Sequence, residues 1–311
     1  MTLFRTLRRW QLLLLLASLG VPIVLMLWKP YVLIEGLQRG GLYAVIALPM
    51  ALILGVVGII NLAHGEFMML GAYFAYWMGV YAGLDPLVAM IPAVVAFALL
   101  GAITYVLTIR RALKAPELNQ LLLTFGMAMV GAEFANLMWT SQPLKPHLSY
   151  VYSSMALGEL RFGTYAFIYT AAAIVLLVLL HLFLRKTRLG RAALAVGQNP
   201  RGARLVGIDV NRTYLLIFSV SIALVGALGA MFLTRHSVFP SAGSPFTMKS
   251  FCLIAMAGIG NLPGVVWGGF GLGIAEALVS SFRGYGGWAD VVFFAVLVAV
   301  IMGKSYRRQT A

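Results

Sequence analysis

Asn61, His64 and Glu66 follow one another closely at a point where a long apolar stretch is interrupted. Polar side chains inside a bilayer are costly, and those that occur there often mark a substrate or ion pathway. We therefore interpret the three residues as candidates for a gate or a polar lining of such a pathway. The alternative is a helix start, at which Asn61 caps the helix and Glu66 sits favourably in its first turn. Glu133, close to Asn136, is a further carboxylate within an apolar stretch.

A second interruption lies between two apolar stretches near the C-terminus. Gly260, Asn261, Pro263 and Gly264 separate the two, and Glu276 follows inside the second. Breaks in a helix at membrane depth are tolerated only where protein or a water-filled cavity covers the free backbone groups. We interpret these five residues as further candidates for a translocation path. The alternative is ordinary helix packing, with a structural hydrogen bond for Glu276.

A longer basic segment covers residues 185–212 and carries the signals of a short helix. Asn199-Pro200 is typical of a helix start, because Asn accepts hydrogen bonds from free N–H groups and Pro loses nothing at the first helical position. Gly207 is suited to end the helix. A capped helix of this kind would dock into a groove of a partner protein. The alternative is a basic loop that only sets the membrane topology.

The apolar side chains of this short helix are Ala203, Leu205 and Val206, with basic residues beside them. We expect them to form one small apolar face. The residues expected to take part in docking are Arg188, Gly190, Arg191, Asn199, Pro200, Arg201, Ala203, Arg204 and Gly207.

The sequence carries no ATP-binding or catalytic motif. Gly303-Lys304-Ser305 lacks the preceding Gly of a phosphate-binding loop, since Val298 stands at that position, and it follows an apolar stretch instead of a strand. The four His and the single Cys form no metal-ligand pattern. We therefore expect no enzyme activity, no cofactor and no metal in this chain, and any ATP hydrolysis must come from another subunit.

The elements that hold these residues are about ten apolar segments, most of them near the roughly 20 residues that a membrane span needs. The chain is 61% hydrophobic and only 10% charged, whereas soluble domains are about one quarter charged. This composition predicts an all-α integral membrane protein, a polytopic helical bundle in membrane lipid. The segments cover 11–28, 36–60, 65–83, 86–109, 121–139, 164–184, 213–233, 247–260, 263–281 and 288–303.

Two of these segments leave the number of crossings open. The stretch 247–260 is short for a full crossing, so with 263–281 it forms either two spans or one broken, re-entrant element beside eight spans. The stretch 11–28 follows three arginines, like a signal peptide, but it is long and no cleavage site follows it. We expect it to remain as the first span, and the chain 1–311 to be one transmembrane domain.

The basic residues predict the orientation. With the N-terminus inside and ten crossings, sixteen of the 23 Lys and Arg residues fall in the inside segments 1–10, 110–120, 185–212 and 304–311. This bias follows the positive-inside rule, so both termini are predicted to be cytoplasmic. The net charge of +14 is therefore explained by topology, and we expect no nucleic-acid partner.

Three motifs resemble the branched-chain amino acid ABC permeases of the LivH type. One is T-R-L-G-R-A followed by N-P-R-G-A-R-L-V-G-I-D in the basic segment. The second is the stretch 41–73 with N-L-A-H-G-E, where that family typically has N-F-A-H-G-E. The third is A-G-I-G-N-L-P-G-V-V-W-G-G-F-G-L-G-I-A-E-A-L at 257–278. The resemblance covers roughly residues 35–300 and departs from the family at Leu54, Leu62 and Leu194.

This resemblance implies the permease subunit of a bacterial ABC importer in the inner membrane, working by alternating access. It implies a second permease, expected to form a heterodimer, two cytosolic ATPases that dock on residues 185–212, and a periplasmic binding protein. The implied substrates are branched-chain or other amino acids, amides or urea. The rival hypothesis is a secondary transporter or channel, in which Glu66, Glu133 and Glu276 relay protons.

Overall fold

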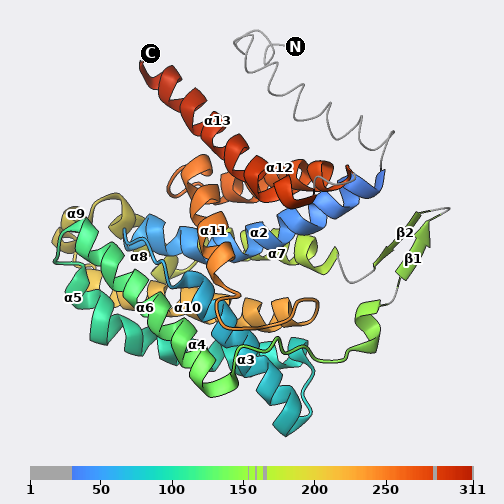
Figure 1. Cartoon of the computed structure of the whole chain (residues 1–311). Helices are drawn as coiled ribbons and strands as arrows, with labels where there is room; N and C mark the ends of the chain where they lie inside the picture. Colours follow the sequence, from blue (N-terminus) through green and yellow to red (C-terminus); the bar gives the residue numbers. More distant parts are fainter. Residues whose placement is uncertain (1–29, 153, 158–159, 164–166, 283–285, 310–311) are drawn as a thin grey trace.

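The computed structural model describes residues 30–152, 154–157, 160–163, 167–282 and 286–309, and helices make up most of this part of the chain (Figure 1). A π-helix, Tyr105–Ile109, joins the helix Pro86–Thr104 to the helix Arg110–Ala112. The helices are α2 (Pro30–Val56), α3 (His64–Ala82), α4 (Pro86–Thr104), α5 (Arg110–Ala112), α6 (Glu117–Trp139), α7 (Phe167–Lys186), α8 (Arg188–Gln198), α9 (Pro200–Leu205), α10 (Val210–Leu233), α11 (Ser244–Ala257), α12 (Leu262–Ser280) and α13 (Ala289–Gln309).

Six helical segments of the described chain are long and apolar enough to cross a membrane: α2, α4 with its continuation to Ala112, α6, α7, α10 and α12. The prediction of a multi-pass helical membrane protein is therefore confirmed, but the count of about ten crossings is not. The predicted span 11–28 lies outside the described residues. At 14 residues α11 is about 21 Å long, less than the roughly 30 Å of a hydrocarbon core, as the short stretch 247–260 predicts.

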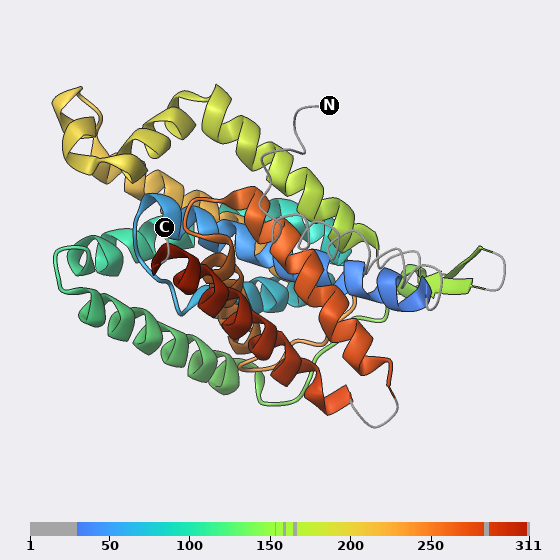
Figure 2. The same ribbon diagram turned by 90° about the horizontal axis from the view of Figure 1, so that it is seen from above.

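The described residues between α6 and α7 contain a small amount of regular structure. Strands β1 (Ser154–Leu157) and β2 (Leu160–Gly163) pair antiparallel, and Leu144 forms an isolated bridge with Val238. Short hydrogen-bonded strands are compatible with a polar setting beyond the helix ends. Both views place this hairpin at one end of the molecule and helices α8 and α9 at the opposite end (Figures 1 and 2).

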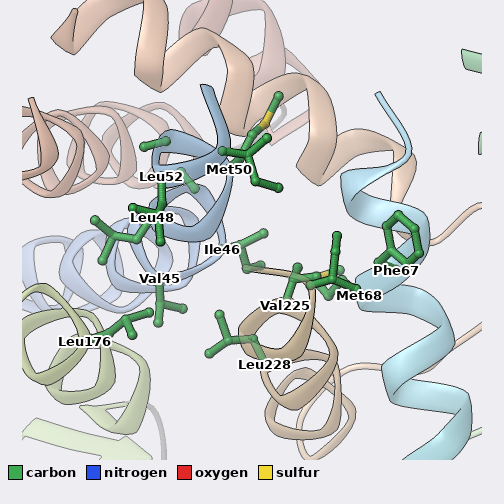
Figure 3. Packing of buried hydrophobic residues seen from close by; sticks show 14 of the residues in the cluster. Val45, Ile46, Leu48, Met50, Leu52, Phe67, Met68, Leu176, Val225 and Leu228 are labelled. Atoms are coloured by element: carbon green, nitrogen blue, oxygen red, sulfur yellow. The ribbon is translucent and has the colours of Figure 1, made fainter. Parts of the chain in front are cut away.

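Helix α2 lies at the centre of the bundle and is the most buried of the six apolar helices. Its side chains converge with those of α3, α7 and α10 in one apolar core (Figure 3). A helix that is hydrophobic all round is stable when protein or lipid covers every face. Here neighbouring helices supply that cover, so α2 holds the bundle together.

Glycines bring α2 and α12 into backbone contact. A Cβ atom at Gly40 would lie 2.6 Å from the carbonyl oxygen of Gly269, and one at Gly36 would lie 2.6 Å from the Cα of Ile274. The pairing runs in opposite directions along the two helices, so they are antiparallel. Small residues allow such close approach, which is a principal source of helix association in lipid. The glycine-rich stretch 257–278 therefore serves at least in part as a packing surface for α2.

We predict that Gly273→Ala lowers the stability of the purified chain by about 1–3 kcal/mol, because the added methyl group would overlap the backbone of Gly36 and Gly40. Gly271 of the same helix is the matched control, since a Cβ there meets no atom within 4 Å. Gly271→Ala should leave stability unchanged or raise it by up to about 1 kcal/mol. Thermal unfolding in detergent measures both, and equal melting temperatures would contradict the packing role.

Candidate functional site

Two helix starts meet in the interior of the bundle. The backbone N–H of Gly65, in the first turn of α3, donates a hydrogen bond of 2.7 Å to the Oγ1 atom of Thr247 in α11. Gly243, which precedes α11, packs directly against Gly65, and a Cβ on either glycine would overlap the backbone of the other. Segments 57–63 and 234–243 thus both lead into the bundle before a new helix begins. Such discontinuous helices are a feature of transporter interiors.

The first turn of α3 brings together the three polar residues predicted from the sequence. His64 is fully buried, and its Nε2–H donates a hydrogen bond of 2.8 Å to the carbonyl oxygen of Ile46 in α2. Ile46 lies ten residues before the end of α2, so α3 begins about 15 Å along α2 from that end. Asn61 is also fully buried, and Glu66 nearly so.

Each of these side chains keeps one polar atom that has no hydrogen-bond partner among the described residues. The atoms are Nδ2 of Asn61, Nδ1 of His64 and Oε2 of Glu66, all buried. The helix-start interpretation is correct for Glu66, which lies in the first turn of α3, whereas Asn61 bonds the N–H of Ala63, just before the helix. Because buried polar atoms are normally satisfied, three orphaned ones in one turn mark a place where water or a transported molecule would find partners.

The second predicted turn, at residues 258–261, lies at the C-terminal end of α2. A Cβ at Gly55 would come within 3.5 Å of the Cα of Gly260. Asn261 is exposed, and its Oδ1 accepts a hydrogen bond of 3.0 Å from the N–H of Gly264, with Pro263 in the first turn of α12. These residues are therefore placed about a turn at the end of the bundle.

Glu276 lies in a buried network that joins four helices. Its carboxylate accepts hydrogen bonds from Tyr43 of α2 at 2.8 and 3.0 Å. It pairs with Arg39 and with Lys249 of α11, each at 3.3 Å. Lys249 also pairs with Asp290 of α13 at 2.9 Å. A carboxylate at membrane depth is stabilised when cations and donors surround it in this way.

Arg39, Tyr43, Lys249 and Asp290 were not predicted as site residues. Arg39 and Lys249 fall within the predicted apolar segments 36–60 and 247–260, and the structure places them within α2 and α11. The sequence does contain one indication of this network, because Glu35 lies one turn before Arg39 and pairs with it at 2.6 Å. A carboxylate and a guanidinium four residues apart in an apolar stretch indicate a paired charge on one helix face.

The third predicted carboxylate stands apart. Glu133 is exposed on α6, and its Oε2 lies 3.5 Å from the Nδ2 of Asn136. Among the described residues, no hydrogen bond or ion pair links Glu66, Glu133 and Glu276 to one another. In the same part of the chain, no three His, Cys, Asp or Glu side chains are grouped so that they could hold a metal ion.

Helix α9 forms at the predicted place in the basic segment, and a second helix, α8, which was not predicted, precedes it. Asn199 caps α9 by accepting a hydrogen bond of 2.9 Å from the N–H of Gly202, and Pro200 is the first helical residue. Gly207 has a φ of 83°, a conformation that favours glycine and ends the helix. Thr187 caps α8 in the same manner through the N–H of Gly190. The local sequence therefore determines both helices.

The apolar residues of α9 point two ways, and not to one face as expected. Ala203 is buried with Val196 and Val210, and it holds α9 to α8 and α10. Leu205 and Val206 are 89% and 75% exposed. The remaining predicted docking residues divide similarly: Gly190 is buried, whereas Arg188, Arg191, Arg201 and Arg204 are exposed.

The end of α8 contacts the end of α2. A Cβ at Gly197 would lie 2.7 Å from the carbonyl oxygen of Gly55, which is itself beside Gly260. This close approach puts α8, the C-terminal end of α2 and the turn at 258–261 in one contact region. A movement of α8 and α9 would therefore displace α2 and that turn as well.

Comparison with known proteins identifies similar chains. Residues 32–301 match the family model described as "Branched-chain amino acid transport system / permease component". The high-affinity branched-chain amino acid transport system permease proteins LivH of Salmonella typhimurium and BraD of Pseudomonas aeruginosa are each 28% identical, over 86% and 87% of this chain and 91% and 92% of their own lengths. The resemblance to LivH-type permeases that the three motifs predict is confirmed.

More distant similarities extend beyond that group. The autoinducer 2 import system permease protein LsrC of an Enterobacter species is 30% identical over 71% of this chain and 64% of its own length. The solved structure of PsaBC from Streptococcus pneumoniae in complex with Fab has 14% identity and a TM-score of 0.49, and it covers 91% of this chain and 95% of that one.

We predict that Thr247→Val destabilises the chain by about 1–3 kcal/mol, because it leaves the buried N–H of Gly65 without an acceptor. Thr247→Ser keeps a hydroxyl at that position and should retain most of the stability. Thermal unfolding of both purified variants in detergent tests this. Equal melting temperatures of Thr247→Val and Thr247→Ser would contradict a stabilising role of this hydrogen bond.

Glu276→Gln should lower stability by about 1–3 kcal/mol, because the amide cannot neutralise Arg39 and Lys249. The loss stays in this range because Arg39 retains Glu35 and Lys249 retains Asp290. Glu133→Gln, an equivalent change on an exposed face of α6, should alter stability by less than about 0.5 kcal/mol. The comparison uses the same melting assay, and an equal effect of the two changes would argue against a structural role of the network.

Proposed function

Because the chain belongs to the branched-chain amino acid transport permease family, we propose that it is the membrane-spanning permease subunit of a bacterial ABC importer. The whole chain, residues 1–311, would then be one permease domain in the inner membrane, with cytoplasmic termini. It would assemble with a second, similar permease as a heterodimer, with two cytosolic ATPases and with a periplasmic substrate-binding protein.

The single observation that carries this proposal is the surface formed by α8 and α9. The short helix α9 is capped at its start, and its buried Ala203 packs against α8 and α10. Leu205 and Val206 are exposed at one end of the molecule. Exposed apolar side chains rimmed by charged ones are typical of a docking surface. The exposed arginines nearby match a partner surface of acidic character. We assign this surface to the ATPase subunits, which supply the ATP hydrolysis.

The contact between α8 and α2 supports a route for coupling. In alternating access, closure of the ATPases would shift α8 and α9, and the backbone contact of Gly197 with Gly55 would pass that shift to α2. Helix α2 carries the Ile46 carbonyl that binds His64 and packs against the turn at 258–261. The candidate path residues Asn61, His64 and Glu66 would thus follow the movement of the docking surface.

For the substrate we propose a small polar molecule of the class that LivH-type systems take, namely branched-chain or other amino acids or related amides or urea. The support comes from the relatives LivH and BraD, which match this chain over most of their length and whose names specify branched-chain amino acid transport. The binding protein would select among these molecules before delivery to the permease.

Replacing both Leu205 and Val206 by Ser should reduce co-purification of the ATPase subunits by about tenfold or more, because two apolar contacts are lost from the interface. The exposure of both side chains means that the permease itself should fold and melt as before. Leu118→Ser is the matched control, because Leu118 is an exposed apolar residue in the first turn of α6.

The measurement is the ratio of ATPase to permease after affinity purification of the tagged full-length chain from membranes. A ratio that stays unchanged in the double variant, or that falls equally with Leu118→Ser, would contradict ATPase docking at α9.

A further inference from the structure

A cavity of about 330 Å³ lies beside the N-terminal half of α2, toward the opposite end of that helix from α8. It is bounded by α2, α7, α12, the first turn of α11 and the segment between α10 and α11. Its volume is at the lower limit of ligand pockets, so it suits a small molecule. Its lining consists of Glu35, Gln38, Arg39, Leu42, Tyr43, Tyr169, Arg235, His236, Phe246 and Glu276.

The charged lining is balanced and contains both signs. Two carboxylates, Glu35 and Glu276, face the cavity, and Arg39 between them pairs with each, at 2.6 and 3.3 Å. The second guanidinium belongs to Arg235, which has no carboxylate partner in the described part of the chain. Arg235 and Glu35 are also the more exposed of the four charged side chains. They can therefore meet a ligand without breaking the buried network of Glu276.

The uncharged lining separates into an apolar wall and two polar side chains. Tyr43 lies 6.3 Å from Phe246 between ring centroids, and Leu42 is buried beside them on α2. Gln38 offers an amide that makes no hydrogen bond among the described residues. His236 is neutral near pH 7, because burial and nearby cations lower its pKa to about 4. Its Nδ1 atom is buried and has no hydrogen-bond partner in the part of the chain that the structure describes.

We propose that this cavity binds a small zwitterion with an apolar side chain, an α-amino acid, on its way through the permease. The carboxylate of the ligand would face Arg235, its ammonium group would face Glu35, and its side chain would rest against Leu42 and Phe246. A neutral molecule such as urea would leave Arg235 without a counter-charge when the cavity is filled. Because only a zwitterion offers both a carboxylate to Arg235 and an ammonium group to Glu35, the cavity would favour it over a neutral molecule.

This assignment rests on the proposed transport function and narrows its substrate class. Among amino acids, amides and urea, only the first carries both charges together with an apolar group. The site also lies next to α11, whose start contacts the start of α3 through Thr247 and Gly65. A ligand in the cavity would therefore lie beside the junction at which the discontinuous helices α3 and α11 meet.

The test uses protection of a single cysteine in the full-length chain, assembled with its partner subunits in right-side-out membrane vesicles. Cys252 is the only cysteine of the chain, so Gln38→Cys combined with Cys252→Ala gives one thiol in the cavity. Labelling by a charged thiosulfonate is followed with leucine, urea or 4-methylpentanoate present. Leucine at about twice its dissociation constant should slow labelling about threefold, and the other two compounds should not.

Matched variants separate the site from general effects. Arg235→Gln in the same background should abolish protection by leucine, whereas Glu133→Gln should leave it intact. Val80→Cys in the Cys252→Ala background, at an exposed residue of α3 outside this cavity, should be labelled at the same rate with and without leucine. These controls exclude a change of the reagent or of the membrane as the cause of protection.

Labelling of Gln38→Cys that leucine does not slow at any concentration, or that leucine, urea and 4-methylpentanoate slow equally, overturns the proposal. Protection by leucine that survives Arg235→Gln overturns the assigned role of Arg235. The assay needs no ATP hydrolysis. Failure of the cavity assignment is thus distinguished from failure of ATPase docking, which the Leu205 and Val206 variants report.

Discussion

The hydrogen bond from Gly65 to Thr247 joins two helices that begin inside the bundle, and the arrangement of the interior depends on it. Backbone groups that leave a helix within a membrane must find partners in the protein, because lipid offers none. The direct packing of Gly65 against Gly243 allows one helix start to satisfy the other. His64 adds a bond to the carbonyl of Ile46, so α2 anchors the same junction.

Helix α2 connects that junction to both ends of the molecule. On one side its glycines admit α12 at backbone distance, and Tyr43 and Arg39 hold Glu276. On the other side Gly55 contacts α8, which leads to the exposed tip of α9. Because helices in backbone contact are closely packed, displacement of one helix must displace its neighbour. The surface of α8 and α9, the path candidates and the charged cavity are thereby connected through contacts of α2.

The charged side chains around Glu276 are arranged in pairs and not singly. Lys249 would be costly alone at this depth, yet it lies between Glu276 and Asp290 and over the ring of Tyr43. The pairing leaves Glu276 committed to structure, while the less buried Glu35 and Arg235 remain open to a ligand. Among the described residues, Glu66 lies apart from this network.

Sequence patterns alone determined most of the apolar helices, the shortness of the helix near 247–260 and the caps of α9. Each depends on composition or on residues a few positions apart, such as Asn199 and Gly202. Contacts between Glu276 and Arg39, or Gly65 and Thr247, join residues far apart in the chain, and only the tertiary structure decided them. The physical reason is that lipid and protein neighbours are equally apolar. Hydrophobic periodicity in a membrane helix therefore does not reveal which face packs against which partner.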